Sequence, residues 1–140
     1  MLVTLSFALD KHDRESFLVA FRKYFNKVLP ERIAISSLYR AFVSDFTRNP
    51  WIYMEKYDKY DFTNPRTNEY DTYTFKCDEN IKECFYNNNL DLGMKPSEIL
   101  RCFTFDFTID PFFYISRYGG KDTARMSTEI SPLQFFDMNA

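Results

Sequence analysis

The sequence predicts an α+β domain of the ferredoxin-like sandwich type, in which a four-stranded antiparallel sheet carries helices on one face. Two observations predict it. Apolar residues alternate with polar ones in four short segments, and the stretches between these segments have helical spacing. Taken in order, the segments read β-α-α-β-β-α-β, with an extra helix after the first crossover. Residues 1–140 are enough for a single domain with a continuous core, followed by a polar tail (122–140) that we expect to be flexible.

The first strand is predicted over residues 2–9, where every second residue is apolar. Asp10 and Asp13 offer N-cap oxygens for a helix that stops at Pro30. A second helix follows and ends before Asn49-Pro50. The apolar residues at helical spacing are Phe17, Leu18, Phe21, Tyr24, Phe25 and Val28 in the first helix, and Ile35, Leu38, Tyr39, Phe42, Val43 and Phe46 in the second.

In the second half, "WIYMEKY" (51–57) and "YDTYTFKC" (70–77) are predicted to be strands joined by a long polar hairpin loop. Asp78 is predicted to cap a short helix, which "NNNLDLG" breaks, and Pro96 starts another helical turn that reaches Leu100. The last strand is predicted in "CFTFDFTID" (102–110), where Phe and Ile alternate with Thr and Asp. "PFFYISRYGG" (111–120) then leaves the sheet as a loop or a short helix.

The composition is unusual for its sixteen Phe and ten Tyr against three Gly. Asn, Asp, Ile and Lys are also abundant, as AT-rich coding tends to produce, and this favours a virus or a mobile element as the source. No apolar run approaches the roughly 18 residues that span a bilayer, and the N-terminus lacks the basic region of a signal peptide. Three cysteines without CxxC spacing indicate buried thiols in an intracellular, cytoplasmic protein.

Several kinds of site are excluded by the residues present. His12 is the only histidine, and we expect it to be exposed near a helix start. No phosphate-binding glycine loop and no nucleophile elbow occurs, so we predict no cofactor. Asp106 and Asp110 share a strand face but lie about 13 Å apart along it, too far for one metal ion. The other acidic residues near the hairpin favour a solvated face, so we predict no metal site. These residues are Glu55, Asp58, Asp61 and Asp71.

Three fragments resemble a known family, the HUH endonucleases that initiate rolling-circle replication. "LVTLSF" (2–7) resembles their first strand, "WIYMEKY" the strand before their metal-binding hairpin, and "FDFTIDPFFYISRYGGK" (105–121) their late strand and helix. The resemblance implies a ferredoxin-like palm in which Tyr114 attacks a DNA phosphate, with Arg117 and Tyr118 completing the pattern. "EYDTYTF" stands where the family has its metal-binding H-x-H pair. The resemblance therefore implies a palm that binds DNA and no longer nicks it.

Tyr114 has two interpretations, a nucleophile or its relic, and an aromatic residue of the core or of a helix cap. Arg117, Lys121 and Arg125 form a basic stretch that suits phosphate contacts or a solvated loop equally. Near the C-terminus, Phe135 and Phe136 are available to dock on the domain or on a partner.

Three hypotheses for function follow. The first in order of preference is a non-catalytic interaction module, an inhibitor or structural adaptor that binds a protein partner through the bare sheet face or through Phe135 and Phe136. Its negative net charge, −2, favours this hypothesis. The second is a palm-like protein that binds single-stranded nucleic acid through Arg117, Lys121 and Arg125. The third is a metal-dependent nuclease built on carboxylates such as Asp106. Whether the protein is an enzyme stays open, although catalysis is disfavoured.

Overall fold

The computed structural model describes residues 1–24 and 31–118. Within these residues the chain forms two strands and six helices around one aromatic core. The elements are β1 (Leu2–Asp10), α1 (Lys11–Tyr24), α2 (Glu31–Arg48), α3 (Pro50–Tyr57), β2 (Tyr70–Asp78), α4 (Glu79–Leu92), α5 (Pro96–Ile109) and α6 (Pro111–Tyr118). The fold is α+β, but the predicted four-stranded ferredoxin-like sandwich is wrong, because the sheet has only two strands.

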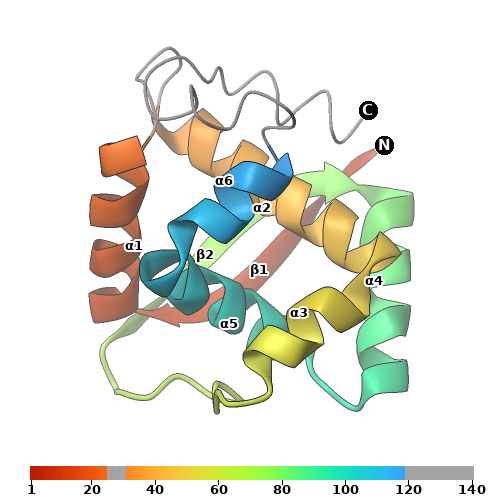
Figure 1. Cartoon of the computed structure of the whole chain (residues 1–140). Helices are drawn as coiled ribbons and strands as arrows, with labels where there is room; N and C mark the ends of the chain where they lie inside the picture. Colours follow the sequence, from red (N-terminus) through yellow and green to blue (C-terminus); the bar gives the residue numbers. More distant parts are fainter. Residues whose placement is uncertain (25–30, 119–140) are drawn as a thin grey trace.

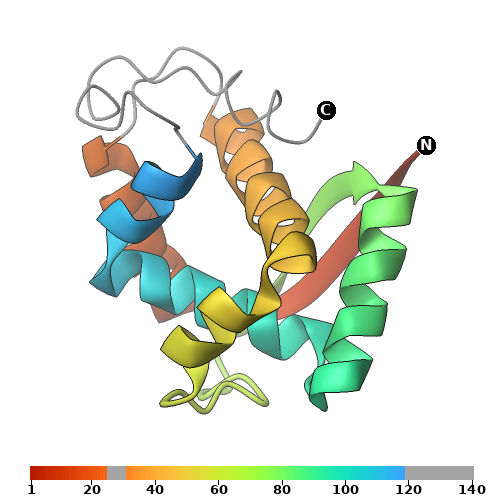
Figure 2. The same cartoon turned by 45° about the vertical axis from the view of Figure 1, so that its right-hand side comes forward.

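The two strands form an antiparallel ribbon in which Leu2 lies opposite Asp78 and Asp10 lies opposite Tyr70. The strands predicted at 2–9 and 70–77 are therefore confirmed. Figures 1 and 2 show the helices gathered on one side of this ribbon. The inner face carries the apolar residues Leu5, Phe7, Leu9, Phe75 and Cys77, all of them buried. The outer face is largely exposed and carries mainly threonine and serine, with Leu2 and Tyr70 exposed toward opposite ends of the ribbon, so it presents no continuous hydrophobic patch.

Helices α1 and α2 confirm that two helices follow the first strand. The predicted last part of the first helix, with Phe25 and Val28, lies outside the described residues. α1 buries Phe17 and Phe21, four residues apart on one face. α2 lies deeper and buries residues on most of its surface, with Phe42 and Phe46 at its centre. α2 therefore forms the middle of the core, with the ribbon and the other helices arranged around it (Figure 1).

The segment 51–57 is the helix α3, and the prediction of a strand there is wrong. Proline is favoured at the first position of a helix, where its missing N–H costs nothing, and Pro50 occupies that position. Tyr53 and Tyr57 are both buried, and their spacing of four residues places them on one helical face. Trp51, which a strand would turn inward with them, is 72% exposed. The polar loop of residues 58–69 therefore connects a helix to β2 and is not a hairpin.

Helix α4 begins as predicted, because the Asp78 carboxylate accepts hydrogen bonds from the backbone of Asn80 (2.9 Å) and Ile81 (3.3 Å). It does not break at the three consecutive asparagines. It continues to Leu92 and ends at Gly93, whose φ of 73° is a left-handed conformation that glycine adopts without strain.

The predicted last strand is also wrong, because "CFTFDFTID" lies in helix α5 and its last residue, Asp110, caps that helix. Ile99, Phe103 and Phe107 recur every four residues and are completely buried, whereas Ile109 is 61% exposed. The alternation of Phe103, Phe105 and Phe107 coexists with this helical spacing, which is the one that the core uses. The short helix predicted as one form of the segment after Asp110 is present as α6.

The two spacings make different predictions for alanine substitutions in α5. Phe107→Ala removes a completely buried ring and should lower the free energy of unfolding by about 3–5 kcal/mol. Ile109→Ala should change it by less than about 0.5 kcal/mol, because that side chain faces solvent. Urea denaturation followed by circular dichroism measures both. Comparable losses for the two variants would favour a strand, in which both side chains lie on one face.

The three cysteines form no disulfide, as predicted, but only two of them are buried. Burial raises the pKa of the Cys77 thiol to about 11 and that of the Cys102 thiol to about 12. Cys84 lies on the exposed side of α4. Reactivity toward thiol reagents depends on the thiolate and on access, so the raised pKa values and the burial of Cys77 and Cys102 both slow their reaction, whereas Cys84 is accessible.

We therefore expect iodoacetamide at pH 8 to alkylate Cys84 quickly and Cys77 and Cys102 only after unfolding. Mass spectrometry of tryptic peptides over time measures the three rates, and Cys84→Ser gives the background. Denaturant should equalise the rates. Fast labelling of Cys102 in the native protein would contradict its position in the core.

Candidate binding site: a cavity between helices α1 and α2

Tyr114, the nucleophile or core residue of the sequence prediction, lies inside the core. Its side chain is completely buried, and its hydroxyl donates a hydrogen bond to Asp106 Oδ2 at 2.6 Å. Burial raises the pKa of this hydroxyl well above its usual range. A nucleophilic tyrosine has to reach its substrate and lose its proton. The geometry here instead gives Tyr114 the role of a hydrogen-bonded core residue.

Asp106 is the acceptor at the centre of a buried hydrogen-bonding cluster. Besides Tyr114, it accepts a hydrogen bond from Tyr60 at 2.6 Å, and Lys56 Nζ lies 3.4 Å from it. The same ammonium group contacts Asp110 at 2.9 Å. Asp106 and Asp110 therefore share a lysine, Asp106 from within α5 and Asp110 from its C-cap, and do not lie along a strand. No group of three potential metal ligands occurs in residues 1–24 and 31–118, so a nuclease that uses Asp106 gains no support.

Arg117 is also committed to contacts inside the protein. Its guanidinium forms an ion pair with Asp45, which also accepts a hydrogen bond from Tyr53. Tyr53 and Tyr118 join their hydroxyls at 2.8 Å. The Arg117 side chain therefore holds α6 against α2. The other predicted contact residues, Lys121, Arg125, Phe135 and Phe136, lie outside the described residues. His12 is exposed in the first turn of α1, as predicted.

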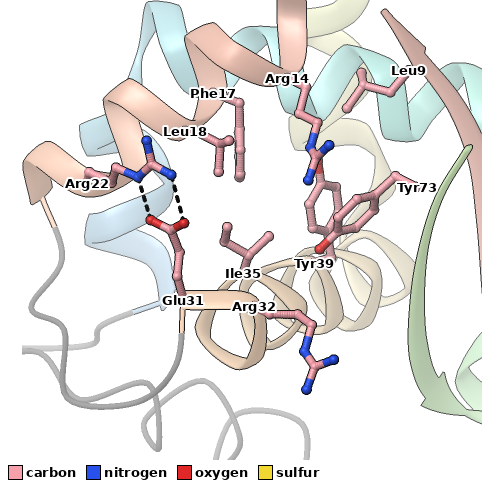
Figure 3. A pocket seen from close by; sticks show the side chains of 10 residues that line it. All are labelled: Leu9, Arg14, Phe17, Leu18, Arg22, Glu31, Arg32, Ile35, Tyr39 and Tyr73. Atoms are coloured by element: carbon pink, nitrogen blue, oxygen red, sulfur yellow. Dashed lines mark hydrogen bonds and ion pairs between the residues drawn. The ribbon is translucent and has the colours of Figure 1, made fainter. Parts of the chain in front are cut away.

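A cavity of about 180 Å³ lies between α1 and α2, beside the start of β2. Figure 3 shows α1 along one side, α2 along the other and Tyr73 of β2 at one end. Its lining is apolar and aromatic and consists of Leu9, Phe17, Leu18, Ile35, Tyr39 and Tyr73. A volume of this size corresponds to about six water molecules, so it admits one large side chain or a small molecule.

Four charged side chains surround this apolar lining, and three of them are arginines. Arg22 and Glu31 form a two-pronged ion pair across one end, with contacts of 2.6 and 2.9 Å (Figure 3). Arg14 reaches the other end, where its guanidinium points toward the rings of Tyr39 and Tyr73. Arg32 leaves α2 at the rim and points away from the cavity floor. Among the described residues neither Arg14 nor Arg32 has a carboxylate partner, so the cavity carries an excess of positive charge.

Sequence reasoning missed this cavity, although a signal for it exists. Arg14, Leu18 and Arg22 are spaced by four residues and therefore lie on one stripe of α1. On α2 a spacing of three or four residues joins Arg32 to Ile35 and Tyr39. In the sequence, each stripe can be recognised as arginine residues next to apolar residues on one face of a helix. That the two stripes face each other follows only from the tertiary packing.

Comparison with known proteins gives no further guidance. No protein-family model, no curated protein and no solved structure matches this chain. Among the described helices, none has the length and apolar character that a membrane crossing requires. The site is therefore interpreted from its own geometry.

The buried cluster around Asp106 predicts the effect of removing one hydroxyl. Tyr114→Phe removes a donor from the buried Asp106 carboxylate and also the partner of the buried Tyr57 hydroxyl, and should lower the free energy of unfolding by about 1–3 kcal/mol. The matched change Tyr70→Phe, at an exposed ring on β2, should be close to neutral. Urea denaturation measures both variants. Full stability of Tyr114→Phe would show that Asp106 does not depend on this donor.

Proposed function

We propose that this protein is a non-catalytic interaction module that binds an acidic segment of a protein partner at the cavity between α1 and α2. The observation that carries the proposal is the position of Arg14, a cation without a carboxylate partner among the described residues, at the end of an aromatic cavity. An inhibitor or a structural adaptor acts by binding of this kind alone.

The chemistry of the cavity favours a ligand with an anionic end and an apolar stem. A guanidinium presents several N–H donors in a planar fork that matches a carboxylate, and this contact is strong when water is partly excluded. The apolar lining beside it gains from covering a hydrocarbon stem. Glu31, which already occupies the fork of Arg22, is an internal example of the group that such a site accepts.

A protein partner suits the site better than single-stranded nucleic acid, the alternative. Nucleic acid binding needs a line of cations that follows several phosphates, together with aromatic faces on which bases stack. Here the rings of Phe17 and Tyr39 are buried, and the net charge of the chain is −2. Arg117, the described member of the predicted phosphate-binding stretch, is paired with Asp45.

The setting in which the module works is part of the proposal. Three unpaired thiols fit a reducing compartment, and we propose an intracellular, cytoplasmic protein. The abundance of Asn, Asp, Ile and Lys supports a virus or mobile element as its source. In such a setting a small binding module inhibits a host protein or joins components of an assembly.

Charge reversal at Arg14 tests the proposal. The probe is a short fluorescein-labelled peptide in which glutamate alternates with threonine, and its control is the same peptide with glutamine for glutamate. Fluorescence anisotropy should show that the glutamate peptide binds and that Arg14→Glu weakens it about tenfold or more. Arg32→Glu should have a smaller effect, because Arg32 lies at the rim.

Lys95→Glu is the matched control, since Lys95 is exposed and does not line the cavity. It makes the same change in net charge and should leave binding unchanged. Equal losses for Arg14→Glu and Lys95→Glu would reduce the effect to bulk charge and contradict the site. Tighter binding of a labelled single-stranded oligonucleotide than of the peptide would favour the nucleic-acid alternative.

A further inference from the structure

We infer that the acidic segment binds as an extended strand along the free edge of β2, next to the cavity. The inference rests on the proposed function and specifies how the partner lies on this site. Extended peptides join exposed sheet edges through backbone hydrogen bonds, while pockets beside the edge select their side chains. Three features of the β1–β2 ribbon support this mode.

The first feature is the direction of the backbone groups of β2. At one end of the ribbon, the Lys11 N–H donates to the Glu69 carbonyl at 3.0 Å. At the other end, the Glu79 N–H donates to the Met1 carbonyl at 3.0 Å. Both pairs continue the register of the strands and join odd-numbered residues. Because directly bonded pairs alternate along an antiparallel ladder, the even-numbered residues of β2 direct their N–H and C=O groups away from β1.

The second feature is that side chains of the protein cross the edge of β1 at two places, on either side of Ser6, and the edge of β2 at one place. On β1, Lys82 donates to the outward Thr4 carbonyl at 2.8 Å and Arg101 to the Ala8 carbonyl at 3.1 Å. On β2, Arg40 donates to the Lys76 carbonyl at 3.2 Å. Within the part of the chain that the structure describes, the outward backbone groups of Thr72 and Thr74 have no such partner.

An edge of this kind is a template for another strand. β2 contains no proline, and its nine residues pair with β1 in continuous register, without a bulge. Natural proteins block the edges that they need to keep unpaired, with lysine side chains, bulges or covering elements. The side chains of Lys82 and Arg101 do this on either side of Ser6 in β1, and that of Arg40 does it at Lys76 in β2. The absence of an equivalent over Thr72 and Thr74, among the described residues, marks that stretch as the one left to a partner.

The third feature is that the open stretch borders the cavity. Tyr73, between Thr72 and Thr74, turns its side chain to the inner face and lines the cavity opposite Arg14 (Figure 3). Side chains of an added strand would alternate in the same way as those of β2. Those on the inner side would face the cavity and Arg14, where a glutamate or aspartate finds its counter-charge. Those on the outer side would continue the exposed threonine face, where the protein makes few contacts that could select one side chain over another.

Proline at position 72 separates edge pairing from other modes of binding. The Thr72 N–H points away from β1, so proline there removes an outward donor without removing a bond of the ribbon. We expect Thr72→Pro to weaken binding of the glutamate–threonine peptide about tenfold, while Thr72→Ala binds as the unchanged protein does. Thermal unfolding followed by circular dichroism checks that both variants fold.

Hydrogen exchange on the unchanged protein gives a second reading that requires no variant. Amide exchange followed by NMR should show that the peptide protects the Thr72 and Thr74 amides, and that the already bonded amides of Tyr73 and Phe75 change little. If Thr72→Pro does not fold, protection at these two amides decides the question alone.

The outcomes distinguish this inference from the proposed function. Binding that depends on Arg14 but neither responds to Thr72→Pro nor protects Thr72 and Thr74 would overturn edge pairing and leave the cavity as the site. Binding that responds to Thr72→Pro and ignores Arg14→Glu would keep the edge and overturn the acidic cavity. Absence of peptide binding would overturn both.

Discussion

The structure depends on the need to satisfy tyrosine hydroxyl groups inside an aromatic core. Tyr53, Tyr57 and Tyr114 are almost completely buried, and a buried hydroxyl without a partner costs more than the hydrogen bond it forfeits. Asp45 accepts from Tyr53 and Asp106 from Tyr114, and the Tyr57 hydroxyl forms a hydrogen bond with that of Tyr114. Lys56 and Arg117 in turn supply positive charge beside these carboxylates, which would otherwise be buried ions without partners. These contacts join α2, α3, α5 and α6 into one unit. Residues that looked like surface chemistry in the sequence therefore belong to the interior.

The same core explains why a two-stranded ribbon is sufficient. An isolated pair of strands is marginally stable in water and needs a packed face. Here that face is covered by aromatic residues of the helices. Tyr39 of α2 lies 5.0 Å from Tyr73 and 5.2 Å from Phe75, measured between ring centroids, and its hydroxyl bonds Thr104 of α5. The helices thus give the ribbon the stabilising contacts that additional strands supply in a larger sheet.

The elements that the sequence predicts correctly are those with one consistent signal. The strand at 2–9 alternates over its whole length, and α1 and α2 have helical spacing over several turns. Asp78 indicates the start of α4, because it can cap a helix there. The two wrong strands, 51–57 and 102–110, satisfy both periods, because aromatic residues stand two and four positions apart. In these two segments, the local arguments for a helix are the length of the apolar pattern and the prolines Pro50 and Pro96, which stand at the starts of α3 and α5. The cavity escaped prediction because its two stripes meet only through tertiary packing.

The helical structure of the segment 51–57 is also what makes edge binding possible. In a ferredoxin-like sheet, 2–9 and 70–77 are the central pair, and they are the pair observed here. In that arrangement the segment 51–57 flanks 70–77 and closes the edge that Thr72 and Thr74 present. Because 51–57 folds as α3 and packs Tyr53 and Tyr57 into the core, it is absent from that edge. Because Tyr53 and Tyr57 reach the core from a helix and not from a strand, β2 is left open on one side, next to Arg14. A partner strand would occupy the position that the chain's own second strand holds in the larger sheet.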